Sequence, residues 1–297
     1  MISHPLLVVA IPAYNEARYL ERTIASLLSQ TWRDFAILIC DNASTDRTGE
    51  IGKAAAERDP RVHYVRHETN IGAVGNFNYA LDATDSQFFM WLGAHDMIAP
   101  EFLERHIGAL RNDDRLSVSY SLTGWIDEQD RLVKVTAVSN LAFMPRSAIT
   151  RYLASAQRIN ECTAINNVIR RADLNLVRFQ NIAGTDHVIL SHLLYRGPGH
   201  CIAEPLYLRR EPPSVREDYM HRMTGEQDLM RDFTAIIPQY LNDFDQLTRQ
   251  RLSRFWARPI LRAILAARFG PKPAGYVARA TNKAFAIAME AWLPSGQ

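Results

Sequence analysis

The chain has 297 residues with 47% hydrophobic content, enough to bury a sizeable core as one large domain or as a domain with an appendage. No apolar run approaches the ~20 residues that span a bilayer, and no basic segment precedes the N-terminal apolar run, so we expect neither a membrane helix nor a signal peptide. Three widely spaced cysteines give no disulfide framework and no zinc spacing, so we expect a cytoplasmic protein, and we expect no nucleic-acid partner.

Apolar strands alternate with helices over the first hundred residues. Short, continuous apolar runs predict buried strands at Leu6–Ile11, Phe35–Cys40, Val62–Val65 and Phe88–Leu92. Helical spacing predicts helices over 17–30, from about residue 47, and over 76–83. This alternation predicts an α/β protein with a parallel, doubly wound sheet.

Polar clusters follow three of these strands, in the sequences PAYNE (12–16), DNASTD (41–46) and GAHD (93–96). A turn or a helix cap would explain each cluster separately. Together they meet at the carboxyl edge of one parallel sheet, where open α/β sheets bind ligands. They offer a carboxylate for the N–H of a base, hydroxyls and amides near a ribose, and an oxygen ligand for a divalent cation, which predicts a nucleotide diphosphate site.

Residues 8–51 resemble the opening of family 2 glycosyltransferases, and NIGAVGNFNYALDAT (70–84) is similar to the Asn-x-Gly loop and helix of that family. The resemblance runs to about Arg216. It implies a GT-A-type fold, with a Rossmann-like, mostly parallel sheet and flanking helices. It also implies an inverting enzyme that moves a sugar from a nucleotide-diphosphate donor to an acceptor hydroxyl on a glycan, a lipid-linked molecule or another compound. We expect a UDP-sugar donor, because Asp41 would face the ring edge of uracil or thymine.

The resemblance, taken residue by residue, implies a donor site at the strand ends and the following loops. Either Arg209 or Arg210 would reach the donor phosphates, and we assign Arg210; the alternative is that both are solvated charges at the sheet edge. The expected donor-binding residues are Pro12, Ala13, Tyr14, Glu16, Asp41, Ser44, Asn70, Gly72, Asn76, Ala94, His95 and Arg210.

The expected metal motif departs from the pattern of the family. Where the family usually has Leu-Asp-x-Asp-Asp, this chain has Leu92-Gly93-Ala94-His95-Asp96, with Asp96 at the last acidic position. Asp96 and His95 are the expected ligands of Mn²⁺ or Mg²⁺, and a nitrogen ligand favours manganese. Two alternatives stay open, a weakly bound ion and no ion, and with them a catalytically impaired nucleotide- or sugar-binding protein. A dinucleotide oxidoreductase is disfavoured because Gly72–Gly75 lacks the three-glycine phosphate loop.

The second half predicts a helix over 101–111, a strand over 116–122, a hairpin over 125–135 and a strand over 163–169. The segment Asn181–His187 then leads into an apolar helix. It is similar to the motif in which a family aspartate takes the proton of the acceptor, and Asp186 matches that general base. An aspartate at a helix start is often only a cap, which is the alternative role.

The C-terminal region is strongly basic, with nine basic residues and Glu290 alone after residue 245, a net charge of +8. We predict helices over 226–244 and 248–269, the second with Arg251, Arg254, Arg258 and Arg262 along one face. Such a face binds an anionic membrane or is simply solvated. We expect a glycosyltransferase domain over 1–216, divided at residue 100 into nucleotide- and acceptor-binding parts. A helical basic region over 217–297 would place the protein in the cytoplasm or at the inner face of the membrane.

Overall fold

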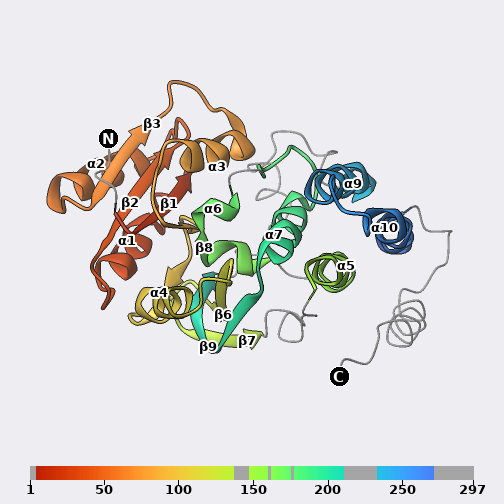
Figure 1. Cartoon of the computed structure of the whole chain (residues 1–297). Coiled ribbons are helices and arrows are strands. Elements are labelled where there is room, and N and C mark those ends of the chain that lie inside the picture. Colours follow the sequence, from red (N-terminus) through yellow and green to blue (C-terminus); the bar gives the residue numbers. More distant parts are fainter. Residues whose placement is uncertain (1–4, 137–146, 160–161, 175–176, 211–232, 271–297) are drawn as a thin grey trace.

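The computed structural model describes residues 5–136, 147–159, 162–174, 177–210 and 233–270 (Figure 1). A sheet with helices on both faces occupies one side of the molecule, and a group of helices from the second half of the chain packs beside it. No described helix has the length and hydrophobicity that crossing a bilayer requires.

Four parallel strands form the first half of the sheet, in the order β3–β2–β1–β4. They are β1 (Leu7–Ala13), β2 (Phe35–Asp41), β3 (Val62–Arg66) and β4 (Phe88–Trp91). In their register Ala13 lies beside Asp41 and Ala10 beside Trp91. The polar segments after β1, β2 and β4 therefore leave the same edge of the sheet, which confirms the predicted parallel arrangement.

Helices cover both faces of this half because strand side chains alternate. Leu7, Val9 and Ile11 of β1 pack with α1 and α4, whereas Val8 and Ala10 belong to a second core with α3 and α7. The helices are α1 (Leu20–Leu28), α2 (Thr48–Arg58), α3 (Gly72–Asp82), α4 (Phe102–Asn112) and α7 (Thr185–Arg196). The expected doubly wound layers are thus present.

Helix α3 begins at Gly72, four residues before the predicted start. Gly72 adopts φ +77°, a left-handed conformation that glycine accepts without strain. Its N–H donates to Oδ1 of Asn70 at 2.8 Å. This local turn brings Asn76 into the body of the helix.

The second half of the sheet is mixed rather than parallel. It continues from β4 through β8 (Val168–Arg170), β6 (Val118–Ile126), β9 (Gly199–Arg210) and β5 (Met97–Ile98), and β7 (Leu132–Thr136) pairs with β6. The β6–β7 pair confirms the predicted hairpin. The strand expected over 163–169 is mostly a 3₁₀ helix, η2 (Thr163–Asn166). Asn167 explains this difference, since its amide donates to the Thr163 carbonyl and accepts the Ser121 N–H.

The C-terminal helices form a third core with α7. This core is enclosed by α5 (Ala148–Arg158), α9 (Ile236–Leu247) and α10 (Arg254–Phe269). The short helix η3 (Phe233–Ala235) directly precedes α9, and α6 (Arg171–Leu174) directly follows β8. Tyr152, Tyr240, Phe244, Leu261 and Leu265 are fully buried there. Of the helix predicted over 226–244, residues 226–232 lie outside the described part of the chain. The helix predicted over 248–269 is α10, which starts six residues later than predicted. The basic region therefore supports the helix that carries Asp186.

Candidate active site

An open cavity lies at the carboxyl edge of β1 and β4, with a volume of about 830 Å³ including the solvent at its mouth. Open α/β sheets bind ligands at this edge. Eight of the predicted site residues line it: Pro12, Ala13, Tyr14, Glu16, Asn76, Ala94, His95 and Asp96. Six further lining residues were not assigned from the sequence, namely Asn42, Ala73, Phe77, Gly93, Asn166 and Arg209.

His95 sits between two carboxylates at the cavity wall. Its Nδ1 lies 3.2 Å from Oε1 of Glu16, and its Nε2 lies 4.0 Å from Oδ1 of Asp96. Burial opposes a charge on the ring, but the charge of Asp96 and the hydrogen bond and charge of Glu16 outweigh burial and raise the pKa of His95. The site therefore favours positive charge between Glu16 and Asp96.

Asp96 is 3% exposed and fixed from two sides. Its Oδ2 accepts from the Tyr207 hydroxyl at 2.6 Å, and its Oδ1 accepts from the backbone N–H of Arg210 at 2.8 Å. A Cβ at position 93 would come within 2.7 Å of Oδ2, so Gly93 leaves room for this carboxylate. The glycine that replaces the first acid of the family motif thus helps to place the remaining one.

Asp41 and Ser44 are buried and are not among the residues that line the cavity. Asp41 is fully buried, and its carboxylate accepts from Tyr64, Arg66 and the Ser44 N–H at 2.6, 2.7 and 2.9 Å. Burial would raise its pKa, but hydrogen bonds from Ser44 and Tyr64 and the charge of Arg66 lower it. To pair with a base, Asp41 must exchange one of these partners, so its contact with the base stays a prediction.

Asn70 and Gly72 also lie outside the lining, in the loop that borders it. The Asn70 carboxamide accepts from the Asn42 side chain at 2.7 Å and from the Gly72 N–H. Asn42 in turn accepts the Ile71 N–H at 2.9 Å and lines the cavity. These two predicted residues shape the loop around Asn42.

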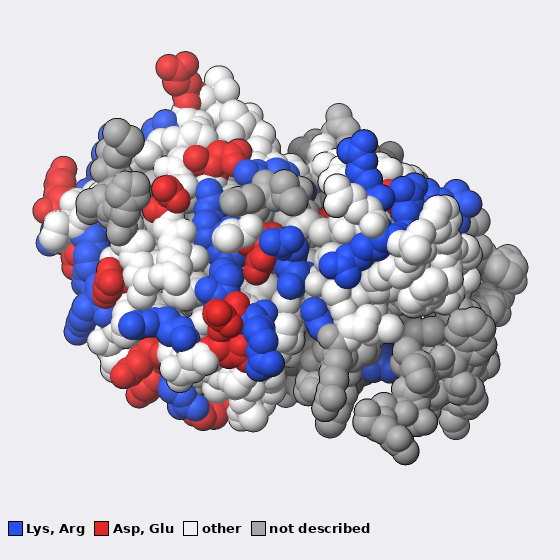
Figure 2. All heavy atoms as spheres, in the orientation of Figure 1, with Lys and Arg blue, Asp and Glu red and all other residues white. Residues whose placement is uncertain are grey.

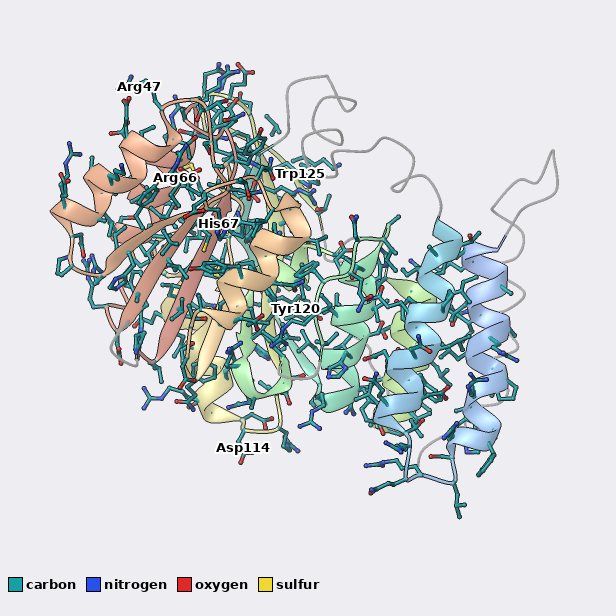
Figure 3. All side chains as sticks on the ribbon, turned by 90° about the horizontal axis from the view of Figure 1, so that it is seen from above. Arg47, Arg66, His67, Asp114, Tyr120 and Trp125 are labelled. Carbon is teal, nitrogen blue, oxygen red and sulfur yellow. The ribbon has the colours of Figure 1, made fainter. Side chains whose placement is uncertain are left out.

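Arg210, predicted to reach the donor phosphates, is buried outside the cavity lining, and Arg209 lines the cavity instead. Successive side chains of β9 point to opposite sides. Arg210 is 2% exposed, donates to the carbonyls of His95 and Asp127 and pairs with Asp130. Arg209 lines the cavity with its guanidinium 5.0 Å from the Trp125 ring centroid. Figure 3 shows Trp125 near the same end of the molecule as Arg66 and His67.

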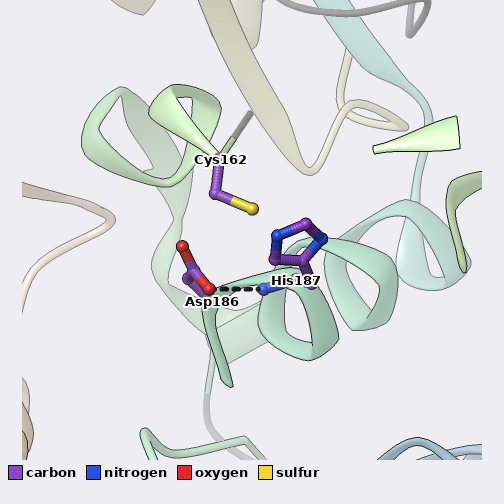
Figure 4. Close-up of side chains that lie close together, drawn as sticks. All are labelled: Cys162, Asp186 and His187. Carbon is purple, nitrogen blue, oxygen red and sulfur yellow. Dashed lines mark hydrogen bonds between the residues drawn. The ribbon is translucent and has the colours of Figure 1, made fainter. Parts of the chain in front are cut away.

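Asp186 stands at the start of α7, where Gly184 adopts φ +78° and turns the chain into the helix. Its Oδ1 accepts the N–H of His187 at 3.0 Å, and the Cys162 thiol lies within 4.8 Å of its carboxylate (Figure 4). Asp186 is not among the cavity-lining residues. Its neighbour Cys162 directly precedes η2, and Asn166 of η2 does line the cavity. The charge of Arg209 acts on both Cys162 and His95. Asp186 therefore lies outside the cavity lining, on the side of the cavity that Asn166 and Arg209 form.

The family model for glycosyl transferase family 2 matches residues 8–177, which is more than half of the chain. The chain belongs to glycosyl transferase family 2. An uncharacterized glycosyltransferase of Methanocaldococcus jannaschii, MJ1057, is 30% identical over 132 residues, covering 44% of this chain and 46% of that protein. The matched segment thus spans about half of that relative's length.

Solved structures confirm the fold expected of a family 2 chain. S. aureus TarS 1–349, crystallised with UDP-GlcNAc, superposes with a TM-score of 0.66 at 17% identity, covering 87% of this chain and 71% of that one. The mannosyltransferase PcManGT from Pyrobaculum calidifontis, in complex with GDP-Man and Mn²⁺, gives a TM-score of 0.52 at 16% identity over 99% and 82% of the two chains. At these identities the likeness concerns the fold alone.

Proposed function

We propose that this family 2 chain is an inverting glycosyltransferase that uses a pyrimidine nucleotide-diphosphate sugar, with UDP as the nucleotide. The observation that carries the proposal is the cavity at the carboxyl edge of the sheet, where Arg209 and the Glu16–His95–Asp96 cluster face one space. A guanidinium binds phosphate oxygens through charge-assisted hydrogen bonds. The solved TarS complex with UDP-GlcNAc supports a nucleotide sugar in this fold.

The reaction requires a base because a sugar hydroxyl is a poor nucleophile at neutral pH. In our proposal Asp186 takes the proton of the acceptor hydroxyl, and the oxygen attacks the anomeric carbon from the face opposite the diphosphate. The bond from this carbon to the phosphate oxygen breaks, and the nucleoside diphosphate leaves, which inverts the configuration. Arg209 would stabilise the negative charge that develops on the leaving group.

The residues beside the diphosphate position fit a divalent cation. Nε2 of His95 and Oδ1 of Asp96 are 4.0 Å apart, within the roughly 4.2 Å that two bonds of 2.1 Å to one ion can span. Glu16 beside Nδ1 would orient the ring, as carboxylates do for histidine ligands. Asp96 and His95 would hold the ion, which when bound neutralises the departing diphosphate. Manganese complexed in PcManGT supports a divalent ion in this fold.

Nucleotide binding tests the donor site directly. We expect UDP to raise the melting temperature, because a ligand that binds the folded state stabilises it, and ADP to raise it much less. In Arg209→Ala the affinity for UDP should fall roughly ten- to a hundredfold, the value of a charge-assisted hydrogen bond. Arg105→Ala is the matched control, since Arg105 pairs with Glu204 at the surface. Equal stabilisation by ADP would contradict the base assignment, and unchanged affinity in Arg209→Ala would contradict the phosphate contact.

We also propose that the α9–α10 end binds anionic membranes, although by different residues from those predicted. Arg254 and Arg258 lie 3.5 and 2.8 Å from Asp245, which neutralises part of the expected basic stripe. Instead Leu252, Phe255 and Trp256 are 85%, 77% and 48% exposed. Figure 2 shows basic side chains over the α9–α10 end with few acidic ones. Exposed aromatic residues among arginines are typical of interfacial binding.

Vesicle sedimentation tests this surface. We expect the wild type to sediment with anionic vesicles and to be released by high salt, at ~1 kcal/mol for each basic residue in contact. The double variant Phe255→Ser with Trp256→Ser should bind several-fold more weakly, whereas Leu132→Ser with Val133→Ser, exposed on β7, should bind normally. Substitution is preferable to truncation because α10 contributes buried Leu261 and Leu265 to the core. Equal sedimentation of both double variants would refute the assignment of this surface to membrane binding.

A further inference from the structure

Three side chains that can bind metals meet at the N-terminus of α7, apart from the cation site proposed for the donor. One ligand atom from each of Cys162, Asp186 and His187 lies within 4.8 Å of the others (Figure 4). Within the described ranges, no other three His, Cys, Asp or Glu residues converge as closely. The three side chains are half-buried, so an ion could reach them from solvent while losing part of its water shell.

We propose that Cys162, Asp186 and His187 form a binding site for a thiophilic divalent cation of the zinc class. The bound ion would also block sugar transfer, because Asp186 cannot accept a proton while its carboxylate binds the ion. This second part of the proposal rests on the proposed role of Asp186 as the general base. Metal binding would thus regulate the enzyme through its general base, Asp186.

The chemistry of the three donors favours zinc over the cation of the donor site. A thiolate and an imidazole are soft and borderline ligands that suit zinc or cobalt, whereas magnesium and manganese prefer oxygen. Thiolate and carboxylate together carry two negative charges, which neutralise a divalent ion in a partly buried place. Three protein ligands leave a fourth tetrahedral position for water, as in open zinc sites.

The geometry requires only small movements to close on an ion. Zinc binds sulfur at ~2.3 Å and nitrogen or oxygen at ~2.1 Å, so tetrahedral ligand atoms lie ~3.5 Å apart. The ligand atoms are at most 4.8 Å apart, so side-chain rotations that move them about an ångström closer bring them to these distances. Gly184 and the first turn of α7 fix the backbone of Asp186 and His187, while η2 fixes Cys162.

Binding converts the thiol of Cys162 into a thiolate, and the thiol proton passes to solvent. Without an ion, burial and the neighbouring Asp186 raise the pKa of Cys162 well above its ordinary value. Arg268 and Arg209 act in the opposite direction, since their positive charges favour the thiolate. Burial of His187 lowers its pKa, which keeps the imidazole neutral and able to bind a metal.

Cobalt titration of the full chain tests the site without using activity. We expect one Co²⁺ to bind with the near-ultraviolet charge-transfer absorption of a cobalt–thiolate bond, and Zn²⁺ to displace it. Cys162→Ser should lose this absorption. In His187→Gln the affinity should fall by more than the roughly ten- to hundredfold loss caused by removing a mere supporting partner of a metal ligand. Cys201→Ser, which changes a half-buried cysteine outside the cluster, should bind as the wild type does.

Several outcomes would overturn the site. They are the absence of thiolate absorption in the wild type, its persistence in Cys162→Ser, and an unchanged affinity in His187→Gln with a normal melting temperature. For the regulatory part, Zn²⁺ should inhibit transfer at saturating Mn²⁺, and His187→Gln should reduce this inhibition relative to its own uninhibited rate. Inhibition unchanged in His187→Gln would overturn regulation through this site. Normal cobalt binding by a protein without transferase activity would instead contradict the proposed function and leave the metal site standing.

Discussion

Asp186→Asn should reduce the rate of sugar transfer by roughly a hundred- to ten-thousandfold, the usual contribution of a general base. The substitution keeps the size of the side chain and an oxygen that accepts the His187 N–H, but it removes the basicity. We therefore expect the affinity for UDP and the melting temperature to stay near those of the wild type. Single-turnover transfer, measured beside UDP binding and thermal unfolding, separates catalysis from helix capping.

Asp82→Asn provides the matched control for Asp186→Asn. Asp82 pairs with Arg178 at the surface and is 58% exposed, so its amide should transfer sugar at the wild-type rate. If Asp186→Asn retained most of its rate, another carboxylate would be the base. If it unfolded, Asp186 would be a structural cap.

Removal of divalent cations should abolish transfer, because Arg209 alone would then balance the charge of the leaving diphosphate. We expect Mn²⁺ to restore activity better than Mg²⁺, since His95 supplies a nitrogen ligand. In His95→Ala this preference for manganese should disappear. The measurement is the transfer rate after exhaustive chelation and after titration with each ion.

His63→Ala is the matched control for the metal experiment, because His63 lies on β3 outside the cavity lining. It should keep the metal preference of the wild type. Full activity after chelation would show that positive side chains replace the ion, and an unchanged preference in His95→Ala would remove His95 from the ligand set.

The sequence by itself determined the first half of the sheet and the edge at which the cavity lies. The short apolar run Phe88–Leu92, bounded by Asp85-Ser86 and Gly93, favours a strand buried on both faces, and β1, β2 and β4 are indeed covered on both sides. Their polar ends then had to meet, because parallel strands share one carboxyl edge. The start of α7 was equally local, since Gly184 and Asp186 mark a turn and a helix beginning.

The tertiary structure decided which of two neighbouring arginines faces the cavity. Arg209 and Arg210 are equivalent in sequence, but the pairing of β9 with β6 places one beside Trp125 at the cavity and buries the other against Asp130. The strand order β8–β6–β9–β5 in the mixed second half of the sheet could likewise not be read from the sequence, because these strands pair with partners that lie far away along the chain. Cys162 and Asp186 lie close together in space although more than twenty residues separate them in the sequence. Contacts of that kind depend on packing between distant segments, and no local spacing encodes them.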